Sequence, residues 1–180
     1  MKFVKDILIV DFEATGFDVE KDDPVQIGLI LLDKNTLQEK LSFSSWIYTN
    51  QELSEAMKGF KWANITKDKF DFIKNAPRLK EVAAEIQKNI PQEFTFSSWN
   101  TFFDFSFWRR LFSAIGVKVS HIHLLDLWTI AYDHLSRNPD YSGDFTSESV
   151  FQFLNLGKRD VHDALNDCRL EAEALRILEK

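Results

Sequence analysis

The chain has 180 residues, of which 44% are hydrophobic, and its formal net charge at pH 7 is −6. This length and apolar content are typical of one globular domain with a substantial core, so we expect residues 1–180 to form a single domain. The acidic balance excludes a broad basic surface of the kind that covers nucleic-acid phosphates, and any nucleic acid would have to be bound locally.

The cysteine content and the N-terminus indicate a cytoplasmic protein. The single cysteine, Cys168, cannot form an internal disulfide, which favours a reducing compartment, and we expect it to pack as a small core residue. The apolar residues near the N-terminus stop at Asp11, too soon for a signal peptide or a membrane-spanning segment. No membrane partner is therefore expected.

The first part of the chain predicts three neighbouring strands. Four successive apolar residues at positions 7–10 are typical of a strand that is buried on both faces. Further strands are predicted at residues 25–32 and 41–48, and the turn-like residues 33–35 join them into a meander.

Two acids, Asp11 and Glu13, form the end of the first predicted strand. Because they are two residues apart, their carboxylates would leave the same face of an extended chain about 7 Å apart or less. Two unpaired carboxylates at this place repel each other and lose hydration, and a hard divalent cation would compensate for both effects. Considered alone, the same pair could also face solvent at the end of a strand.

The middle of the chain alternates between helical and strand patterns. Apolar residues three and four positions apart predict helices at residues 52–57, 67–74 and 78–89. Two short strands are predicted at residues 94–98 and 122–125. Each is followed by a predicted helix, the first at residues 105–115 and the second at residues 127–135. This strand-helix-strand-helix order implies parallel strands.

The last part of the chain predicts two more helices. An exposed loop at residues 138–144 precedes a helix at 148–156, which Gly157 closes, and the final helix covers residues 163–178. Taken together, the elements predict an α/β fold with a mixed sheet and helices on both faces.

Two distant stretches carry further candidate site residues. Asp104 follows the strand at 94–98, where sites collect in α/β sheets, although capping of the next helix would also explain it. His162 and Asp167 lie five residues apart near the start of the last helix. An unbroken helix would direct these two side chains about 140° apart, whereas Asp163 and Asp167 would share a face.

Together, these stretches resemble the DEDDh branch of the RNase H-like 3′→5′ exonucleases, the proofreading-exonuclease superfamily. The first motif, Asp-x-Glu-x-Thr-Gly, is matched by Asp11, Glu13, Thr15 and Gly16. The second and third motifs are matched by Asn100 and Asp104, and by His162, Ala164, Leu165 and Asp167. The resemblance extends from residue 7 to about residue 175. Trp99 departs from it, because many relatives carry a histidine there.

The resemblance implies an RNase H-like mixed five-stranded sheet and hydrolysis at the 3′ ends of single-stranded DNA or RNA. Asp11, Glu13, Asp104 and Asp167 would hold two Mg²⁺ or Mn²⁺ ions, and His162 would be the general base. His162 would then lie outside the regular helix, and Asp163 would be an acid at the helix start. The substrate-binding residues would be Thr15, Gly16, Phe17 and Asn100.

Several alternatives stay open at this point. Phe17 would either stack on the 3′-terminal base or fold back onto the core. A nucleic-acid-binding module that has lost catalysis would share the fold, but it would lack one of the acids. A proofreading subunit would need a polymerase partner, for which no tether is evident beyond about Leu178. A homodimer is not excluded, and the motifs do not encode a preference for DNA or RNA.

Three expectations concern residues outside the motifs. Asp126 is expected to cap the helix that follows it. Arg109 and Arg110 are expected to lie on a solvated helix face, with contact to a phosphate as the alternative. The aromatic residues between positions 102 and 108 are expected to be mostly core, although one or two of them could stack bases.

Overall fold

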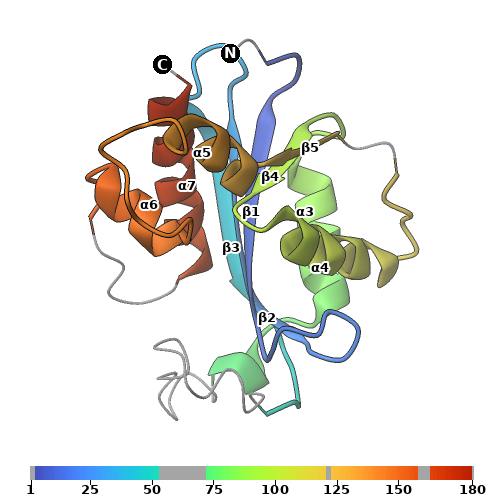
Figure 1. Ribbon diagram of the computed structural model, residues 1–180. Coiled ribbons are helices and arrows are strands. Elements are labelled where there is room, and N and C mark those ends of the chain that lie inside the picture. The colour runs from blue at the N-terminus through green and yellow to red at the C-terminus, as the bar shows by residue number, and fades with distance from the viewer. Residues whose placement is uncertain (1–2, 53–71, 121–122, 158–162, 180) are drawn as a thin grey trace.

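The computed structural model describes residues 3–52, 72–120, 123–157 and 163–179, which form a mixed sheet between two helical layers (Figure 1). The strands are β1 (Ile7–Ala14), β2 (Pro24–Leu32), β3 (Glu39–Trp46), β4 (Thr95–Ser98) and β5 (His123–Asp126). Their spatial order is β3-β2-β1-β4-β5, with β1, β2 and β3 antiparallel and β1, β4 and β5 parallel. The predicted meander and the predicted parallel strands are both confirmed.

Helices cover both faces of the sheet, as predicted. They are α3 (Leu79–Asn89), α4 (Thr101–Ser113), α5 (Leu127–Leu135), α6 (Ser147–Phe153) and α7 (Ala164–Leu178). One face is covered by α3 and α4, and the other by α5, α6 and α7 (Figure 1). The helices predicted at 52–57 and 67–74 lie largely outside the described residues. Among the helices that are described, none is long and apolar enough to cross a bilayer.

β1 is the central strand, and its side chains alternate between two cores. One set packs toward α3 and α4 and consists of Leu8, Val10 and Phe12. The other set packs toward α5 and α7 and consists of Ile7 and Ile9. Because both faces are covered, the strand appears in the sequence as a continuous apolar run. The same alternation places Asp11 and Glu13 on the face that α7 covers.

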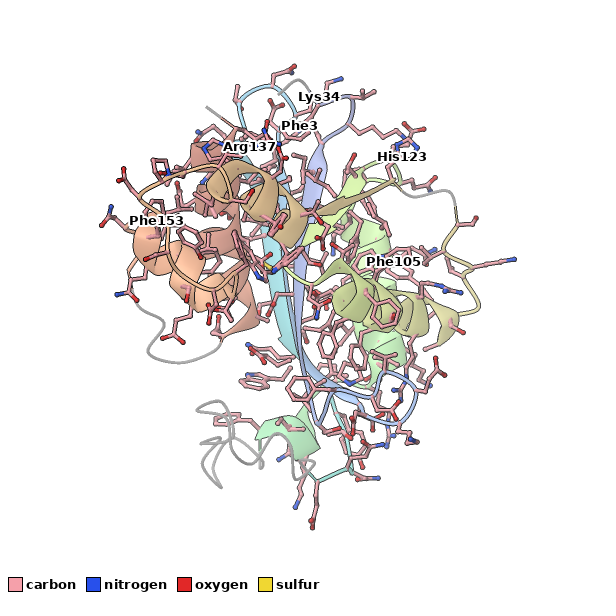
Figure 2. The ribbon with its side chains drawn as sticks, in the orientation of Figure 1. Phe3, Lys34, Phe105, His123, Arg137 and Phe153 are labelled. Carbon is pink, nitrogen blue, oxygen red and sulfur yellow. The ribbon has the colours of Figure 1, made fainter. Side chains whose placement is uncertain are left out.

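α4 supplies much of the aromatic packing on its side of the sheet. Phe107 and Trp108 are 0% and 2% exposed, and the Trp108 ring lies 5.6 Å from that of Phe96 on β4. Phe105, labelled in Figure 2, contacts the same Phe96 ring at 5.2 Å. Phe102 is different, because 80% of its surface is exposed. The expectation of a mostly core segment therefore holds for all of these residues except Phe102.

Several predicted boundaries were wrong because caps and strand pairing set them. The helix predicted at 105–115 begins at Thr101, since the Asn100 side chain accepts a hydrogen bond from the Phe103 amide. The helix predicted at 148–156 ends at Phe153, before Asn155 with its φ of 59°, and not at Gly157. The strand predicted at 41–48 is Glu39–Trp46, the segment that pairs with β2.

Candidate active site

Asp11 and Glu13 extend from the central strand toward α7. The first strand extends beyond the apolar run at residues 7–10 and continues to Ala14, so both acids lie within it, as their spacing predicted. In the register with β2, Asp11 lies opposite Gly28 and Glu13 lies opposite Gln26. Glu13 is 8% exposed, and Asp11 is half-buried. Two acids are thus held on one sheet face by the alternation of the strand.

α7 reaches these acids because β2 has no side chain at Gly28. A Cβ atom at Gly28 would lie 2.2 Å from the carbonyl carbon of Ala164 and 2.3 Å from the amide nitrogen of Leu165. Both are backbone atoms in the first turn of α7, so they cannot rotate away. Glycine at this position therefore allows the start of α7 to touch the sheet beside Asp11.

Asp163 and Asp167 have different roles at the start of α7. Asp163 is the N-cap, and its carboxylate accepts hydrogen bonds from the Asn166 amide and from Gln26 Nε2, both at 3.0 Å. Asp167 lies one turn later and is 1% exposed, with its side chain near Asp11. The predicted role of Asp163 as an acid at the helix start is confirmed.

Asp11, Glu13 and Asp167 form one carboxylate cluster. Each offers an oxygen, and these oxygens lie within 4.8 Å of one another. Carboxylate oxygens are the ligands that hard divalent cations such as Mg²⁺ and Mn²⁺ prefer in proteins. The donor chemistry therefore fits the cations that the motifs imply.

Asp104 approaches the same region along the edge of β1. β4 ends at Ser98 while β1 continues, and the Phe12 amide of β1 donates instead to Asp104 Oδ1 at 3.0 Å. Asp104 is 3% exposed. It does not cap its own helix, because Asn100 does so. The alternative of a capping role for Asp104 is thus wrong, and the backbone of β1 orients its carboxylate.

The buried acids disfavour one another's ionised form. Burial is the main cause that raises the pKa of Asp11 well above its usual value, and the charges of Asp104, Glu13, Glu171 and Asp167 raise that pKa further. A cation held between these carboxylates would reverse the effect, because it would stabilise their charged forms.

Asp104 is subject to opposing effects. Burial raises its pKa to about 7, although the hydrogen bond from the Phe12 amide favours the carboxylate. Near neutral pH this acid therefore takes up or releases a proton readily in the absence of a cation.

Glu171 belongs to the same acidic region and was not among the predicted residues. It is 0% exposed, lies one turn after Asp167 on α7, and its charge raises the pKa values of Asp11 and of the buried Cys168. The sequence does contain a signal for it, since residues four apart on a helix share a face. The burial of Cys168 in this core confirms its expected packing.

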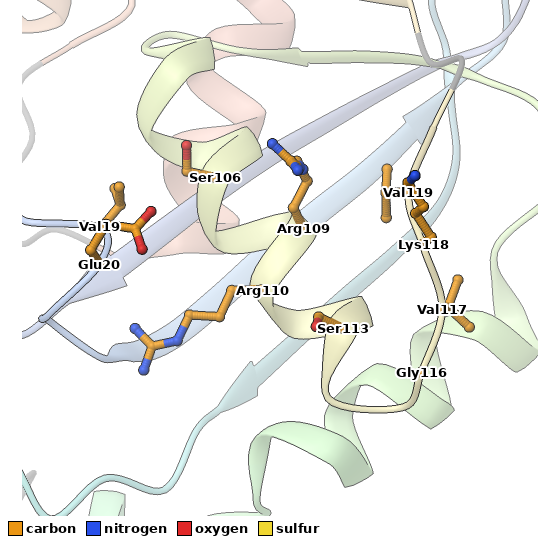
Figure 3. Close-up of a pocket in the computed structure, with 10 residues that line it drawn as sticks. All are labelled: Val19, Glu20, Ser106, Arg109, Arg110, Ser113, Gly116, Val117, Lys118 and Val119. Carbon is orange, nitrogen blue, oxygen red and sulfur yellow. The ribbon is translucent and has the colours of Figure 1, made fainter.

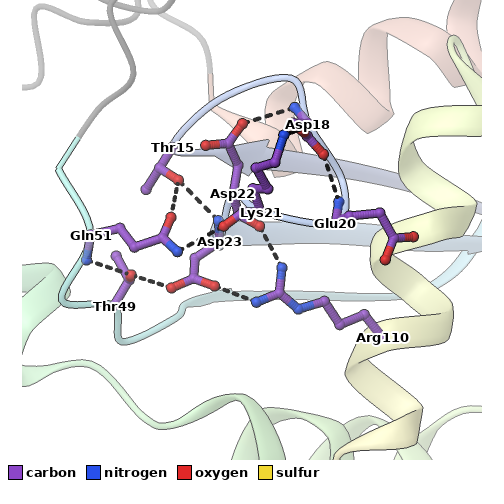
Figure 4. Close-up of polar contacts among 9 residues, drawn as sticks. All are labelled: Thr15, Asp18, Glu20, Lys21, Asp22, Asp23, Thr49, Gln51 and Arg110. Carbon is purple, nitrogen blue, oxygen red and sulfur yellow. Dashed lines mark hydrogen bonds and ion pairs between the residues drawn. The ribbon is translucent and has the colours of Figure 1, made fainter.

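The first motif continues into a loop, and hydrogen bonds of the Thr15 side chain stabilise this loop. Its hydroxyl donates to Gln51 Oε1 and accepts from the Asp23 amide, both at 2.9 Å (Figure 4). The Asp23 carboxylate in turn accepts from the Thr49 hydroxyl at 2.7 Å and pairs with Arg110. Thr15 thus has a structural role here, and its contact with substrate stays a prediction.

Arg110 and Arg109 differ in their surroundings. Arg110 does not lie on a solvated face as expected, because its guanidinium donates to the Asp22 carbonyl and the Asp23 carboxylate and so ties α4 to the loop (Figure 4). Arg109 is exposed, and together with Arg110 and Lys118 it lines a hollow of about 560 Å³ (Figure 3).

The predicted substrate-binding residues lie at the end of β1, in the loop that follows it and at the start of α4. Phe17 is 53% exposed, and its ring lies 6.4 Å from that of Phe103, so stacking on a base and packing back onto the core both stay open. Gly16 lies against the Asp22 side chain, which would be 2.2 Å from a Cβ atom. Asn100 is an exposed helix cap.

Among the other predicted residues, one falls outside the described part of the chain. This residue is His162, so its role and its position before α7 stay predictions. Asp126 caps α5 as expected, since its carboxylate accepts from the Thr129 amide at 2.9 Å. Trp99, the departure from the motif, is half-buried and packs against Phe151 at 5.2 Å.

Comparison with known families agrees with this geometry. The model of the RNase T exonuclease family matches residues 8–175. The chain belongs to this family. Among relatives of the exonuclease family, the 3′-5′ exonuclease DinG of Staphylococcus aureus is 27% identical over 172 residues, which are 96% of this chain and 18% of that protein. The chain thus spans less than a fifth of the length of that relative.

Solved structures share the exonuclease fold. E. coli Exonuclease I in complex with a dT13 oligonucleotide superposes with a TM-score of 0.78 at 16% identity, covering 98% of this chain and 41% of that one. The nuclease domain of 3′hExo, a DEDDh family member bound to rAMP, gives a TM-score of 0.68 at 18% identity. The match covers 97% of this chain and 92% of that domain. The predicted RNase H-like mixed five-stranded sheet is confirmed, and the likeness to these two structures is a likeness of fold.

Proposed function

We propose that this chain removes nucleotides from the 3′ ends of single-stranded DNA or RNA with the help of two Mg²⁺ or Mn²⁺ ions. The observation that carries the proposal is the approach of the Asp11, Glu13 and Asp167 oxygens to within 4.8 Å of one another. The similarity to DinG and to an Exonuclease I that was crystallised with an oligonucleotide supports it.

The proposal assigns a catalytic role to each of the acidic and histidine residues of the three motifs. Asp11, Glu13, Asp104 and Asp167 would hold the cations, with Asp104 oriented by the Phe12 amide. The bound ions would supply Lewis-acid stabilisation of the charge that develops during phosphodiester hydrolysis. His162 would accept the proton of the attacking water, because an imidazole with a pKa near 6.5 is partly neutral at physiological pH.

The proposal extends to the substrate and the setting of the enzyme. Phe17 would stack on the 3′-terminal base, and Thr15, Gly16 and Asn100 would hold the terminal nucleotide near the acids. Residues 1–180 would form one exonuclease domain that acts in the cytoplasm. A homodimer or a polymerase-bound proofreading subunit would perform the same chemistry with an added partner.

Labelled oligomers test the activity directly. DNA and RNA strands with a 5′ label should shorten stepwise from the 3′ end in Mn²⁺ or Mg²⁺, and excess EDTA should stop the reaction. Asp11→Asn should abolish turnover without unfolding the protein, because it removes a charge and leaves no cavity. The matched control is Asp140→Asn, a change at an exposed loop acid. Full activity in excess EDTA would contradict the metal-dependent mechanism.

The second candidate, a binding module without catalysis, is distinguished by the same gel. Such a protein would retain the oligomer without shortening it. The presence of all four acids does not favour this alternative.

A further inference from the structure

A second hollow, of about 830 Å³, lies beside Asn100. It opens between the start of α4, the start of α5 and the loop that precedes α6. Its wall includes Trp99 and Asn100 on one side and Trp128 and Phe145 on the other. Asn100 is four residues from Asp104, or about 6 Å along α4, so the hollow lies at the end of α4 that carries Asp104.

Aromatic rings dominate this hollow and the surface beside it. Trp128 and Tyr132 are 42% and 48% exposed, and their rings are stacked at 5.3 Å with an angle of 12° between the planes. Phe145 lies 4.8 Å from Tyr132 and 6.2 Å from Trp128. The three rings form one aromatic platform, which we define as Trp128, Tyr132 and Phe145.

The fold does not need Trp128 and Tyr132 in these exposed positions. α5 packs onto the molecule through its other face, which consists of Leu127, Ala131 and Leu135, and each of these is at most 2% exposed. Two large exposed aromatic side chains on the same helix face, beside a hollow, are typical of a binding surface.

Charge indicates what kind of group the hollow would bind. Of the described residues that line it, none is a lysine or an arginine, and two are Asp126 and Asp144. Both carboxylates are engaged by neighbours, Asp126 by Thr129 and Asp144 by Thr146. Such a wall would repel a phosphate, whereas the exposed face of Trp128 suits a flat uncharged ring.

We propose that the aromatic platform binds a base of the substrate strand, which stacks on Trp128 while the 3′ end lies among the acids. The proposal rests on the proposed function, because it takes the strand to be the substrate. It adds a binding subsite in α5 and the loop before α6, outside all three motifs. Stacking of this kind is sequence-tolerant, since every base offers a flat face.

The test combines a protein change with a substrate change. Trp128→Ala should raise KM for single-stranded oligomers at least fivefold, with kcat changed less, and Trp128→Phe should restore most of the loss. Phe72→Ala, at a side chain that is 66% exposed on another part of the surface, is the control and should leave KM unchanged. Melting temperatures show whether each variant is folded, and Trp128→Leu replaces Trp128→Ala if that variant unfolds.

Oligomers with one abasic position, moved stepwise from the 3′ end, identify the stacked base. At one position the missing base should weaken binding to the wild-type protein by the same factor as Trp128→Ala weakens binding of the intact oligomer. When both changes are combined, binding should be no weaker than with either change alone. Additive losses at every position, or a Trp128→Ala variant with KM within twofold of wild type, would overturn the proposal. If wild type shortens no oligomer at all, the proposed function itself fails.

Discussion

At the scale of single residues, three different local features hold the acids of the candidate site. Asp11 is placed by the alternation of β1, and Asp104 by the hydrogen bond from the Phe12 amide. Asp167 is placed by a helix whose start Asp163 caps. Because the supports are independent, substitutions at these residues should separate catalytic from structural roles.

The first residue-scale prediction separates Asp163 from Asp167. Asp167→Asn should lower kcat by orders of magnitude, because it removes a carboxylate from the cluster. Asp163→Asn should cost only about 0.3–1 kcal/mol of unfolding free energy, since asparagine also caps helices but carries no charge for the helix dipole. His162→Ala should lose activity and keep its metal affinity. Activity assays and urea unfolding of the three variants measure these effects. An inactive Asp163→Asn variant beside an active Asp167→Asn variant would show that Asp163, and not Asp167, is the metal ligand.

The second residue-scale prediction concerns Phe17, which is 53% exposed and lies beside Phe103. If it stacks on the terminal base, Phe17→Ala should raise KM by a factor that corresponds to about 1–3 kcal/mol. The melting temperature should change little, because a half-exposed ring contributes little to the core. An unchanged KM together with a lower melting temperature would indicate a packing role instead.

At the scale of the elements, the site depends on how closely α7 packs on β2. Gly28 is the point of contact, and the helix backbone leaves no room there for a Cβ atom. α7 carries Asp167 and Glu171, while β2 pairs with the strand that carries Asp11 and Glu13. The spacing of these two elements therefore determines the distance between the acids.

Gly28→Ala should separate the two elements. Overpacking of this kind costs about 1–3 kcal/mol, and the displaced α7 should also weaken the binding of Mn²⁺ measured by calorimetry. Leu29→Ala is the control, because Leu29 is buried in the core on the other face of the sheet. It should destabilise the protein by about 2–5 kcal/mol and leave metal affinity unchanged. Equal metal affinity in both variants would show that the packing of α7 does not control the site.

At the scale of the whole molecule, the chain concentrates negative charge in its interior. The net charge is −6, and several acids are buried around Asp11, where burial and repulsion raise its pKa. Folding without cations therefore carries an electrostatic cost that divalent ions would remove. Metal binding and stability should be linked in this protein.

The linkage gives a prediction about pH. The pKa of Asp104 is about 7 in the folded protein against 3.8 as its ordinary value, so the folded state binds the proton more tightly. In EDTA, the contribution of Asp104 to stability should therefore fall as pH rises from about 4 to about 7, by a total on the order of 4 kcal/mol. Urea unfolding at pH 5 and pH 8 measures this contribution as the difference in unfolding free energy between wild type and Asp104→Asn.

Mn²⁺ should raise the melting temperature of wild type most at pH 8, where the acids are ionised. The control Asp140→Asn should follow wild type at each pH. If wild type gained stability relative to Asp104→Asn between pH 5 and pH 8 in EDTA, the direction of the Asp104 shift would be wrong.

Much of the fold and the candidate metal ligands could be predicted from the sequence, because the signals are local. The apolar run before Asp11 indicates a central strand, since only a strand covered on both faces needs such a run. Helical periodicity indicates the layers, and the motif spacings indicate which acids belong together. Boundaries were less accurate, because a cap such as Asn100 is recognised only once its amide partner is in place.

The tertiary structure alone decided which side chains have partners far away in the chain. Arg110 binds the loop near Asp23, and Asp104 binds the Phe12 amide, and neither contact follows from helical or strand periodicity. Burial of Glu171 and exposure of Trp128 likewise depend on how α7 and α5 lie on the sheet. Periodicity specifies the face of an element, whereas the packing of distant segments determines whether that face meets the core, a carboxylate or solvent.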